Sequence, residues 1–370
     1  MFDYDNTDSD DEYDNILGQT FFNKYLCIKK LGKGSFGSIF QAVYDKEEYA
    51  LKFEDRKKHY DLLQNEAGLM NYLKGPNIPM IKSYGFNSEY NILVMQLLGK
   101  DLEYHLKKRG KFSVKTVCML GFQMINILES IHEKHILHRD IKPENFVMGL
   151  NQYSNIVYLI DFGLAKKYRS MTTLIQYPLT MKKKFTGTAR YASINALKGY
   201  EHSRRDDLES LCYIFIYFLK GKLPWQKIKA KDKEEKYQKI LQKKLEISSS
   251  ELCRGIPKEF ENILDYVKNL EYEEKPDYKK LHDLLDKVMK NGNYKNDYIY
   301  DWSLDEEKNK NEITNDNSLY NHEEKNNKKD ENYHIKRNTK IYYTFEEPEI
   351  NCSSACSIFN FFCIICVFIR

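Results

Sequence analysis

The sequence lacks the features that mark secreted, repeat or nucleic-acid-binding proteins. No Lys or Arg precedes Lys24, and the acidic N-terminal residues contain no apolar run, which predicts that there is no signal peptide. The net charge is only +4, so bulk charge does not favour nucleic acid as a partner, and no internal repeat is visible along the 370 residues. The whole chain has 42% hydrophobic and 30% charged residues, which is the ordinary composition of a soluble domain with a sizeable core.

The paired cysteine spacing of a disulfide framework is also missing. Of the eight cysteines, four lie far apart in the body of the chain, and we expect these to be buried, reduced thiols of a cytosolic protein. They are Cys27, Cys118, Cys212 and Cys253. The other four lie together near the C-terminus.

Changes in composition divide the chain into four parts. They are an acidic disordered tail at 1–21, a folded domain at 22–302, a disordered polar linker at 303–350 and a Cys-rich apolar tail at 351–370. We expect the acidic tail to be a solvated arm, because it contains too few apolar residues to fold alone. An autoregulatory or pseudosubstrate arm that carries Thr7 and Ser9 is the alternative.

Periodicity separates the folded domain into a β-rich part and a helical part. Short β-branched or aromatic runs and one helical pattern precede Gly99, and helical patterns follow it. The runs lie at 25–31, 38–43, 49–53, 81–86 and 92–95 with a helix at 60–74, and later helices are expected at 113–134 (N-cap Ser113), 206–220, 232–243, 257–270 and 278–290. The segment 206–220 is apolar on almost every side, as in a helix at the centre of a large core. The fold class is therefore α+β, with a small β-rich lobe at about 22–98 and a helical lobe at about 99–302.

The clearest chemical pattern is His-Arg-Asp-Ile-Lys-Pro-Glu-Asn at 138–145, followed by Asp-Phe-Gly at 161–163. Together these residues form the H-R-D-x-K-x-x-N and D-F-G pattern of protein kinases. The candidate roles are proton acceptor for Asp140, phosphate-neutralising cation for Lys142 and Mg²⁺ ligands for Asn145 and Asp161. D-F-G alone would be weak, but the longer loop makes the prediction specific.

A glycine-rich stretch at 32–37 provides a candidate ATP-binding loop. Its members are Gly32, Lys33, Gly34, Ser35, Phe36 and Gly37. The G-x-G-x-x-G spacing also occurs in dinucleotide-binding proteins, where a helix follows, but here a β-branched run follows, which favours a hairpin over ATP phosphates. Lys52, at the end of an Ala-Leu-Lys strand, is the candidate phosphate-binding lysine, and Glu66 on the next predicted helix is its expected ion-pair partner.

Several further motifs resemble the casein kinase 1 family over about residues 22–302. Most protein kinases end the activation segment with Ala-Pro-Glu, whereas this chain has Ser-Ile-Asn at 193–195, as that family does. The matching motifs are Gly187–Asn195, Ser203–Leu211, Asp161–Arg169, Leu223–Gln226, Lys275–Tyr278 and Asp297–Trp302. The resemblance implies a two-lobed protein kinase fold and transfer of the ATP γ-phosphate to Ser or Thr, with Mg²⁺, in protein substrates that carry acidic or phosphorylated residues.

The resemblance also implies roles for individual residues. ATP would be bound by the glycine-rich loop, Lys52 and Glu66, with Leu31, Ile39, Ala50, the gatekeeper Met95 and the hinge residue Leu98. The substrate anion site would consist of Lys183, Arg190 and Lys236. Asp207 would hydrogen-bond the backbone of the catalytic loop. The chain departs from the family at Gln96, where Glu is common, at a shortened stretch after Gly99, and at Cys212 and Lys227, where the family has Gly.

The C-terminal tail predicts attachment to a membrane. Its four cysteines, Cys352, Cys356, Cys363 and Cys366, lie among aromatic and aliphatic residues. The chain does not end in a prenylation motif, and the apolar run is shorter than the roughly 20 residues of a spanning helix. S-palmitoylation fits best, because acyl chains and inserting aromatics together give stable anchoring, and gamma-like members of the family also end in acylated cysteines. A zinc site is disfavoured by the apolar setting, and docking of the tail on the kinase domain or on a partner is the alternative.

Two hypotheses of function follow. The first is an active serine/threonine kinase, cytoplasmic and peripheral on the cytoplasmic face of a membrane, with the plasma membrane as the expected one. The second is a catalytically silent kinase-fold scaffold at a membrane. The presence of every charged residue that phosphoryl transfer requires favours the first.

Overall fold

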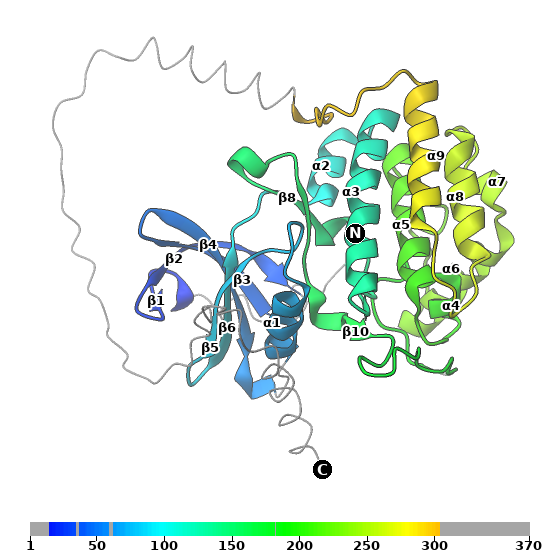
Figure 1. Cartoon of the computed structure of the whole chain (residues 1–370). Helices are drawn as coiled ribbons and strands as arrows, with labels where there is room; N and C mark the ends of the chain where they lie inside the picture. The colour runs from blue at the N-terminus through cyan, green and yellow to red at the C-terminus, as the bar shows by residue number, and fades with distance from the viewer. Residues whose placement is uncertain (1–14, 35–36, 59–61, 182, 304–370) are drawn as a thin grey trace, which may run out of the picture.

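A computed structural model describes residues 15–34, 37–58, 62–181 and 183–303. Within these ranges a β-rich lobe and a helical lobe lie side by side (Figure 1). Residues 1–14, Ser35, Phe36, the linker from 304 and the four C-terminal cysteines lie outside the described residues, so the predictions made for them stay predictions.

An antiparallel six-stranded sheet, in the order β1-β2-β3-β4-β6-β5, forms the smaller lobe. Its elements are β1 (Thr20–Phe21), β2 (Tyr25–Gly34), β3 (Gly37–Tyr44), β4 (Glu47–Asp55), α1 (Leu62–Leu73), β5 (Ile81–Phe86) and β6 (Tyr90–Gln96). The buried side chains of α1, with Ala50 of β4 and Leu93 and Met95 of β6, belong to the same apolar core as the helical lobe, so this core joins the two lobes. The five predicted strands and the predicted helix are confirmed.

The folded domain begins earlier than the prediction of a disordered tail at 1–21. Ile16 is 1% exposed and packs with Phe21 and Phe22 on the outer core of the small lobe. Strand β1 pairs with β2, with Thr20 opposite Leu26. The tail prediction is wrong for residues 15–21, because the acidic composition of the preceding residues concealed a few apolar residues that the sheet buries.

Helices of the larger lobe surround α5 (Arg204–Lys220), whose side chains are nearly all buried. The other helices are α2 (Leu102–Arg109), α3 (Val114–Glu133), α4 (Ile194–Leu197), α6 (Lys233–Glu246), α7 (Ser249–Leu252), α8 (Lys258–Lys268) and α9 (Tyr278–Asn291). The Asp206 carboxylate accepts a hydrogen bond from Ser203 N (2.7 Å), which satisfies a free donor at the start of α5. Gly221 ends it with φ +71°. The five predicted helices are confirmed, and the short helices α2, α4 and α7 had not been predicted.

Helix α3 begins at its predicted N-cap, where Ser113 Oγ accepts from Thr116 N (3.2 Å). Among the described residues it is the one helix that is long and apolar enough to cross a membrane. Most of its apolar window is buried against the rest of the domain, which is typical of a core helix.

Two short antiparallel strand pairs flank the loops that carry the predicted catalytic residues. Strand β7 (Ile136–Leu137) pairs with β10 (Lys166–Lys167), and β8 (Phe146–Met148) pairs with β9 (Val157–Leu159). The loop 138–145 runs from β7 to β8, and Asp161 follows β9. This arrangement brings the two parts of the predicted catalytic pattern together.

Candidate active site

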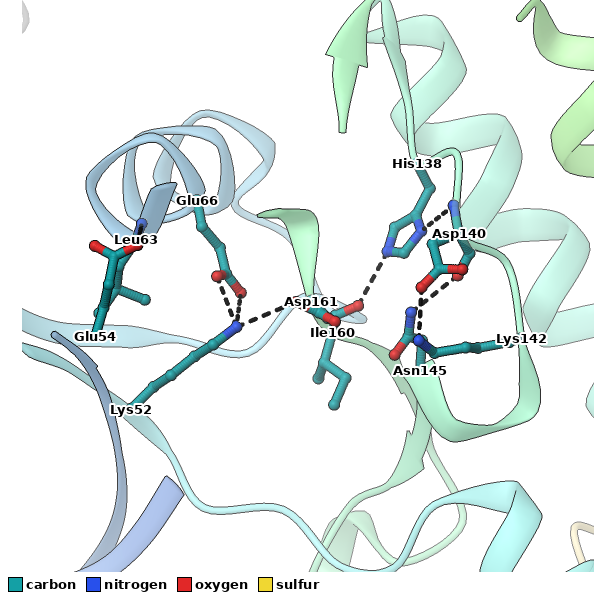
Figure 2. Close-up of polar contacts among 10 residues, drawn as sticks. All are labelled: Lys52, Glu54, Leu63, Glu66, His138, Asp140, Lys142, Asn145, Ile160 and Asp161. Carbon is teal, nitrogen blue, oxygen red and sulfur yellow. Dashed lines mark hydrogen bonds and ion pairs between the residues drawn. The ribbon is translucent and has the colours of Figure 1, made fainter. Parts of the chain in front are cut away.

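The loop 138–145 presents Asp140 in a largely buried position, 6% exposed. One carboxylate oxygen, Oδ2, accepts a hydrogen bond from Lys142 Nζ (2.6 Å), and Oδ1 is buried without a hydrogen-bond partner among the described residues. Asn145 Nδ2 donates to Asp140 O (2.9 Å), which fixes the loop on itself (Figure 2). An orphaned carboxylate oxygen beside a lysine is suited to accept a proton from a bound hydroxyl.

Asp207, near the start of α5, holds the backbone of this loop as predicted. Its carboxylate accepts hydrogen bonds from His138 N and Arg139 N, both at 2.9 Å, and lies 2.9 Å from His132 Nε2. Arg139 adopts the left-handed conformation, with φ +66°, so these contacts maintain an unfavourable backbone. Burial alone would raise the pKa of the Asp207 carboxyl, but the hydrogen bonds from His132 and the loop hold it below its ordinary value.

Lys52 joins the two lobes at the site (Figure 2). Its Nζ lies 2.7 and 3.0 Å from the Glu66 carboxylate oxygens and 3.1 Å from Asp161 Oδ1. Both Lys52 and Glu66 are buried, at 4% and 2% exposed. Burial lowers the pKa of the Lys52 ammonium, but the charges of Glu66 and Asp161 outweigh this effect, so its pKa lies above its ordinary value. The predicted ion pair is present, and it includes the predicted metal ligand.

The predicted adenine-side residues lie on neighbouring strands. Ala50 on β4 is opposite Met95 on β6, and Ile39 on β3 is opposite Lys52. Ala50 and Met95 are buried, Ile39 and Leu98 are half-buried, and Leu31 is exposed at the end of β2.

Gly37 is required by a close backbone contact within the sheet. A Cβ there would lie 1.6 Å from Phe53 O on the neighbouring strand β4, with which β3 pairs, so only glycine fits at this position.

The segment that follows Asp161 returns to the catalytic loop at Gly187. This residue has φ +98°, and a Cβ on it would lie 2.7 Å from Arg139 O and 3.4 Å from Asp140 Oδ1. Only glycine therefore fits this close approach. Arg190 follows three residues further on, and its charge acts on Glu144 of the catalytic loop.

The three predicted anion-site residues occur in different settings. Arg190 Nη1 donates to Tyr191 Oη (3.3 Å), and the guanidinium carbon lies 5.6 and 6.0 Å from the ring centroids of Tyr191 and Tyr217. Lys183, which is largely exposed, forms an ion pair with Glu201 (3.3 Å). Lys236 lies in the first turn of α6. This helix contacts the segment between Asp161 and Gly187 through Tyr237, whose ring meets that of Phe185 edge to face with centroids 5.0 Å apart.

Comparisons with known proteins agree with this geometry. A protein kinase domain model matches residues 25–293. Casein kinase I homolog 3 from Schizosaccharomyces pombe is 46% identical over 298 residues, which cover 79% of this chain and 67% of the relative. The chain belongs to the casein kinase 1 family of protein kinases. The resemblance inferred from Ser-Ile-Asn and the flanking motifs, and the two-lobed kinase fold, are thus confirmed.

The kinase also contains site residues that sequence reasoning missed. Trp225 Nε1 donates to Arg190 O (2.7 Å), Lys244 Nζ donates to Ala192 O, and Ile194 N donates to Glu209 Oε1 (2.9 Å). These three contacts fix the backbone from Arg190 to Ile194. Lys244 lies four residues after the buried Ile240 on α6, so its place on the apolar stripe of that helix was the available signal.

Two acidic residues near Arg190 were also missed. Glu103 and Glu144 each have an Oε2 that is buried without a hydrogen-bond partner in the described part of the chain. Burial raises the pKa of both carboxyls, and the charge of Arg190 opposes this shift. Arg190 therefore partly balances two buried acids of the kinase itself.

Proposed function

We propose that this kinase transfers the ATP γ-phosphate to Ser or Thr of protein segments that carry acidic or phosphorylated residues. We also propose that it works at the cytoplasmic face of a membrane, with the plasma membrane as the expected one, where an acylated C-terminal tail holds it.

The transfer chemistry follows from the loop 138–145. The substrate hydroxyl oxygen attacks the γ-phosphorus, the bond from that phosphorus to the ADP oxygen breaks, and the hydroxyl proton passes to Asp140. Lys142, 2.6 Å from Asp140 in the structure, offers positive charge to the transferred phosphoryl group. The nearby charge of Asp140 outweighs burial and raises the pKa of Lys142, so the lysine stays charged at neutral pH.

The residues at the predicted metal site suit Mg²⁺. Asn145 uses its amide nitrogen to bind Asp140 O, which leaves its oxygen as the atom for a cation, and Asp161 supplies a carboxylate. Hard oxygen ligands and a small number of carboxylates are what Mg²⁺ takes in kinase sites. Mg²⁺ held by Asn145 and Asp161 would neutralise negative charge on the phosphates of ATP.

The observation that carries the substrate proposal is the contact of Gly187 with the catalytic loop. Arg190 follows Gly187 by three residues, and its charge acts on Glu144 in the same catalytic loop, so an anion held by Arg190 would orient a hydroxyl of the same substrate toward the base. Charge-assisted hydrogen bonds of arginine to phosphate or carboxylate are strong enough to select substrates.

A radiolabel assay with a phosphorylated peptide and its unphosphorylated counterpart tests this substrate preference. We expect Arg190→Ala to raise the KM for the phosphorylated peptide by about 10-fold or more, since such contacts contribute about 1.5–3 kcal/mol, and to affect the other peptide less. Asp161→Ala serves as the control for the active site and should abolish transfer to both peptides. Equal KM values for wild type and Arg190→Ala would contradict the substrate proposal, and equal incorporation by Asp161→Ala would contradict the site.

The membrane proposal rests on the composition of the C-terminal tail. We expect replacement of Cys352, Cys356, Cys363 and Cys366 by Ser to release the kinase from cell membranes, because the acyl anchors are lost. Fractionation of cells measures this release. Unchanged membrane association would reject acylation and favour docking of the tail on a partner.

A further inference from the structure

The backbone turn that carries Arg190 is held by buried donors. Trp225 Nε1 donates to Arg190 O at 2.7 Å, and Lys244 Nζ donates to Ala192 O. Both side chains are 2% exposed. Alternate carbonyl groups of one short turn are thus bound by two residues from different parts of the chain, a loop after α5 and the last turn of α6.

Lys244 occupies an unusual position for a lysine. Its Nζ lies 4.2 Å from the centroid of the Tyr213 ring and 4.7 Å from that of Trp225. Burying an amine costs free energy that an apolar side chain of similar size, such as methionine, would avoid. A role confined to core packing therefore does not explain a lysine at this position, whereas the hydrogen bond to Ala192 O does.

The two donors belong to one packed unit. The rings of Tyr213 and Trp225 meet edge to face with centroids 5.0 Å apart, and Tyr213 Oη donates to Glu209 Oε1 at 2.7 Å. The same carboxylate oxygen accepts from Ile194 N, at the end of the turn. Burial lowers the pKa of Lys244 to about 7, opposed by the charge of Glu209. An amine has an N–H to donate whether it is charged or neutral, so the contact with Ala192 O persists on both sides of this pKa.

We propose that Lys244 and Trp225 are positioning residues, which fix the backbone of the Arg190 turn and thereby set the preference of the kinase for phosphorylated or acidic substrates. This inference rests on the substrate preference proposed above. The rings of Tyr191 and Tyr217 hold the guanidinium of Arg190. Trp225 and Lys244 hold the backbone from which the Arg190 side chain extends. A displacement of about 1 Å at a substrate-positioning group is enough to impair its function by orders of magnitude.

The test compares Lys244→Met with the wild-type full chain on a phosphorylated peptide and its unphosphorylated counterpart. The readout is the ratio of kcat/KM for the two peptides, because a variant that is merely less folded loses both values equally and leaves the ratio unchanged. We expect Lys244→Met to lower this ratio by about 5- to 10-fold, mainly through the KM for the phosphorylated peptide. Trp225→Phe keeps an aromatic ring but removes the N–H, so it gives the same test if Lys244→Met does not fold.

Lys220→Met is the matched control. Lys220 also donates to backbone carbonyls, Leu252 O at 2.8 Å and Arg254 O at 3.3 Å, but these lie at the end of α7 and after it, away from the Arg190 turn. We expect its ratio to equal that of wild type. A loss of ratio in Lys220→Met as large as in Lys244→Met would show a general effect of losing a lysine–carbonyl contact and would overturn the inference.

A double-mutant cycle with Arg190→Ala separates the inference from the proposal on which it rests. If Lys244 acts through Arg190, Lys244→Met will lower the ratio little further in the Arg190→Ala background, whereas independent effects would multiply. If Arg190→Ala lowers the ratio and Lys244→Met and Trp225→Phe do not, the inference alone fails. If Arg190→Ala itself leaves the ratio unchanged, the proposed substrate preference fails and the inference fails with it.

Discussion

Replacing Asp207 by Asn is a demanding test of how the catalytic loop is held. The carboxylate accepts from two backbone N–H groups, of His138 and Arg139, and contacts His132 Nε2, each at 2.9 Å. Asn keeps the size of Asp but offers one oxygen, so in either orientation its amide N–H₂ faces at least one of these donors. The variant therefore loses at least one charge-assisted hydrogen bond and leaves a buried donor without a partner.

The expected cost follows from these contacts. A hydrogen bond to a charged group contributes about 1.5–3 kcal/mol, and an unsatisfied buried donor costs about 1–3 kcal/mol. We therefore expect the free energy of unfolding of Asp207→Asn to fall by about 3 kcal/mol, which lowers the Tm by roughly 6 °C in a domain of this size. The backbone of Arg139 is then free to leave φ +66°, and the displacement of Asp140 lowers kcat by about 100-fold.

Thermal unfolding followed by circular dichroism, and steady-state kinetics with an acidic peptide, measure the two effects. Asp283→Asn is the control, because Asp283 is exposed on α9 and pairs with Lys279 in the described structure, so its loss should change stability by less than about 0.5 kcal/mol. An Asp207→Asn variant with a Tm within 1 °C and a kcat within twofold of wild type, as rough limits, would refute the role given to this carboxylate.

Three other perturbations have definite expected outcomes. Glu66→Gln leaves the buried Lys52 with Asp161 as its acidic partner. In steady-state assays it should lower kcat/KM for ATP by about 30-fold, which corresponds to about 2 kcal/mol. An unchanged kcat/KM would contradict the importance of the Lys52–Glu66 pair. Burial lowers the pKa of His105 to about 4, so the protein should lose stability as the pH falls from about 6.5 to 4. His105→Phe removes this titration, so between pH 7 and 5 its unfolding free energy should fall by about 1.5 kcal/mol less than that of wild type. An equal fall in both proteins would contradict this role of His105. Lys227 has φ +64°, so Lys227→Gly should raise the unfolding free energy by up to about 1 kcal/mol in denaturant titrations, and a destabilised variant would contradict the argument.

The catalytic residues could be predicted from the sequence because their spacing is local. Asp140, Lys142 and Asn145 belong to one loop, which is held by contacts among its own residues and by the Asp207 carboxylate of α5, among other contacts. Lys52 and Glu66 were predictable for a similar reason, since one strand and the following helix place them. The helices and strands of the core followed from hydrophobic periodicity, which reports burial directly.

The parts that could not be predicted depend on contacts between distant segments. Lys244 lies on the apolar stripe of α6, but its charge favours an exposed position, and its burial depends on Tyr213, Trp225 and Ala192 O, which come from other segments. Gly37 is needed because it packs against the backbone of the neighbouring strand β4, which its own motif does not reveal. Ile16 follows an acidic stretch closely, and the sheet that buries it is formed by later residues.

The contacts of Lys52 have a consequence for how such an enzyme can be governed. In kinases that rest in an inactive state, the lysine–glutamate pair must be assembled before phosphate can be transferred. Here Lys52 already bridges Glu66 and Asp161, so in the described residues this pair is assembled before any substrate is bound. If the proposed preference for phosphorylated substrates holds, the enzyme that adds the first phosphate would decide when this preassembled site is used.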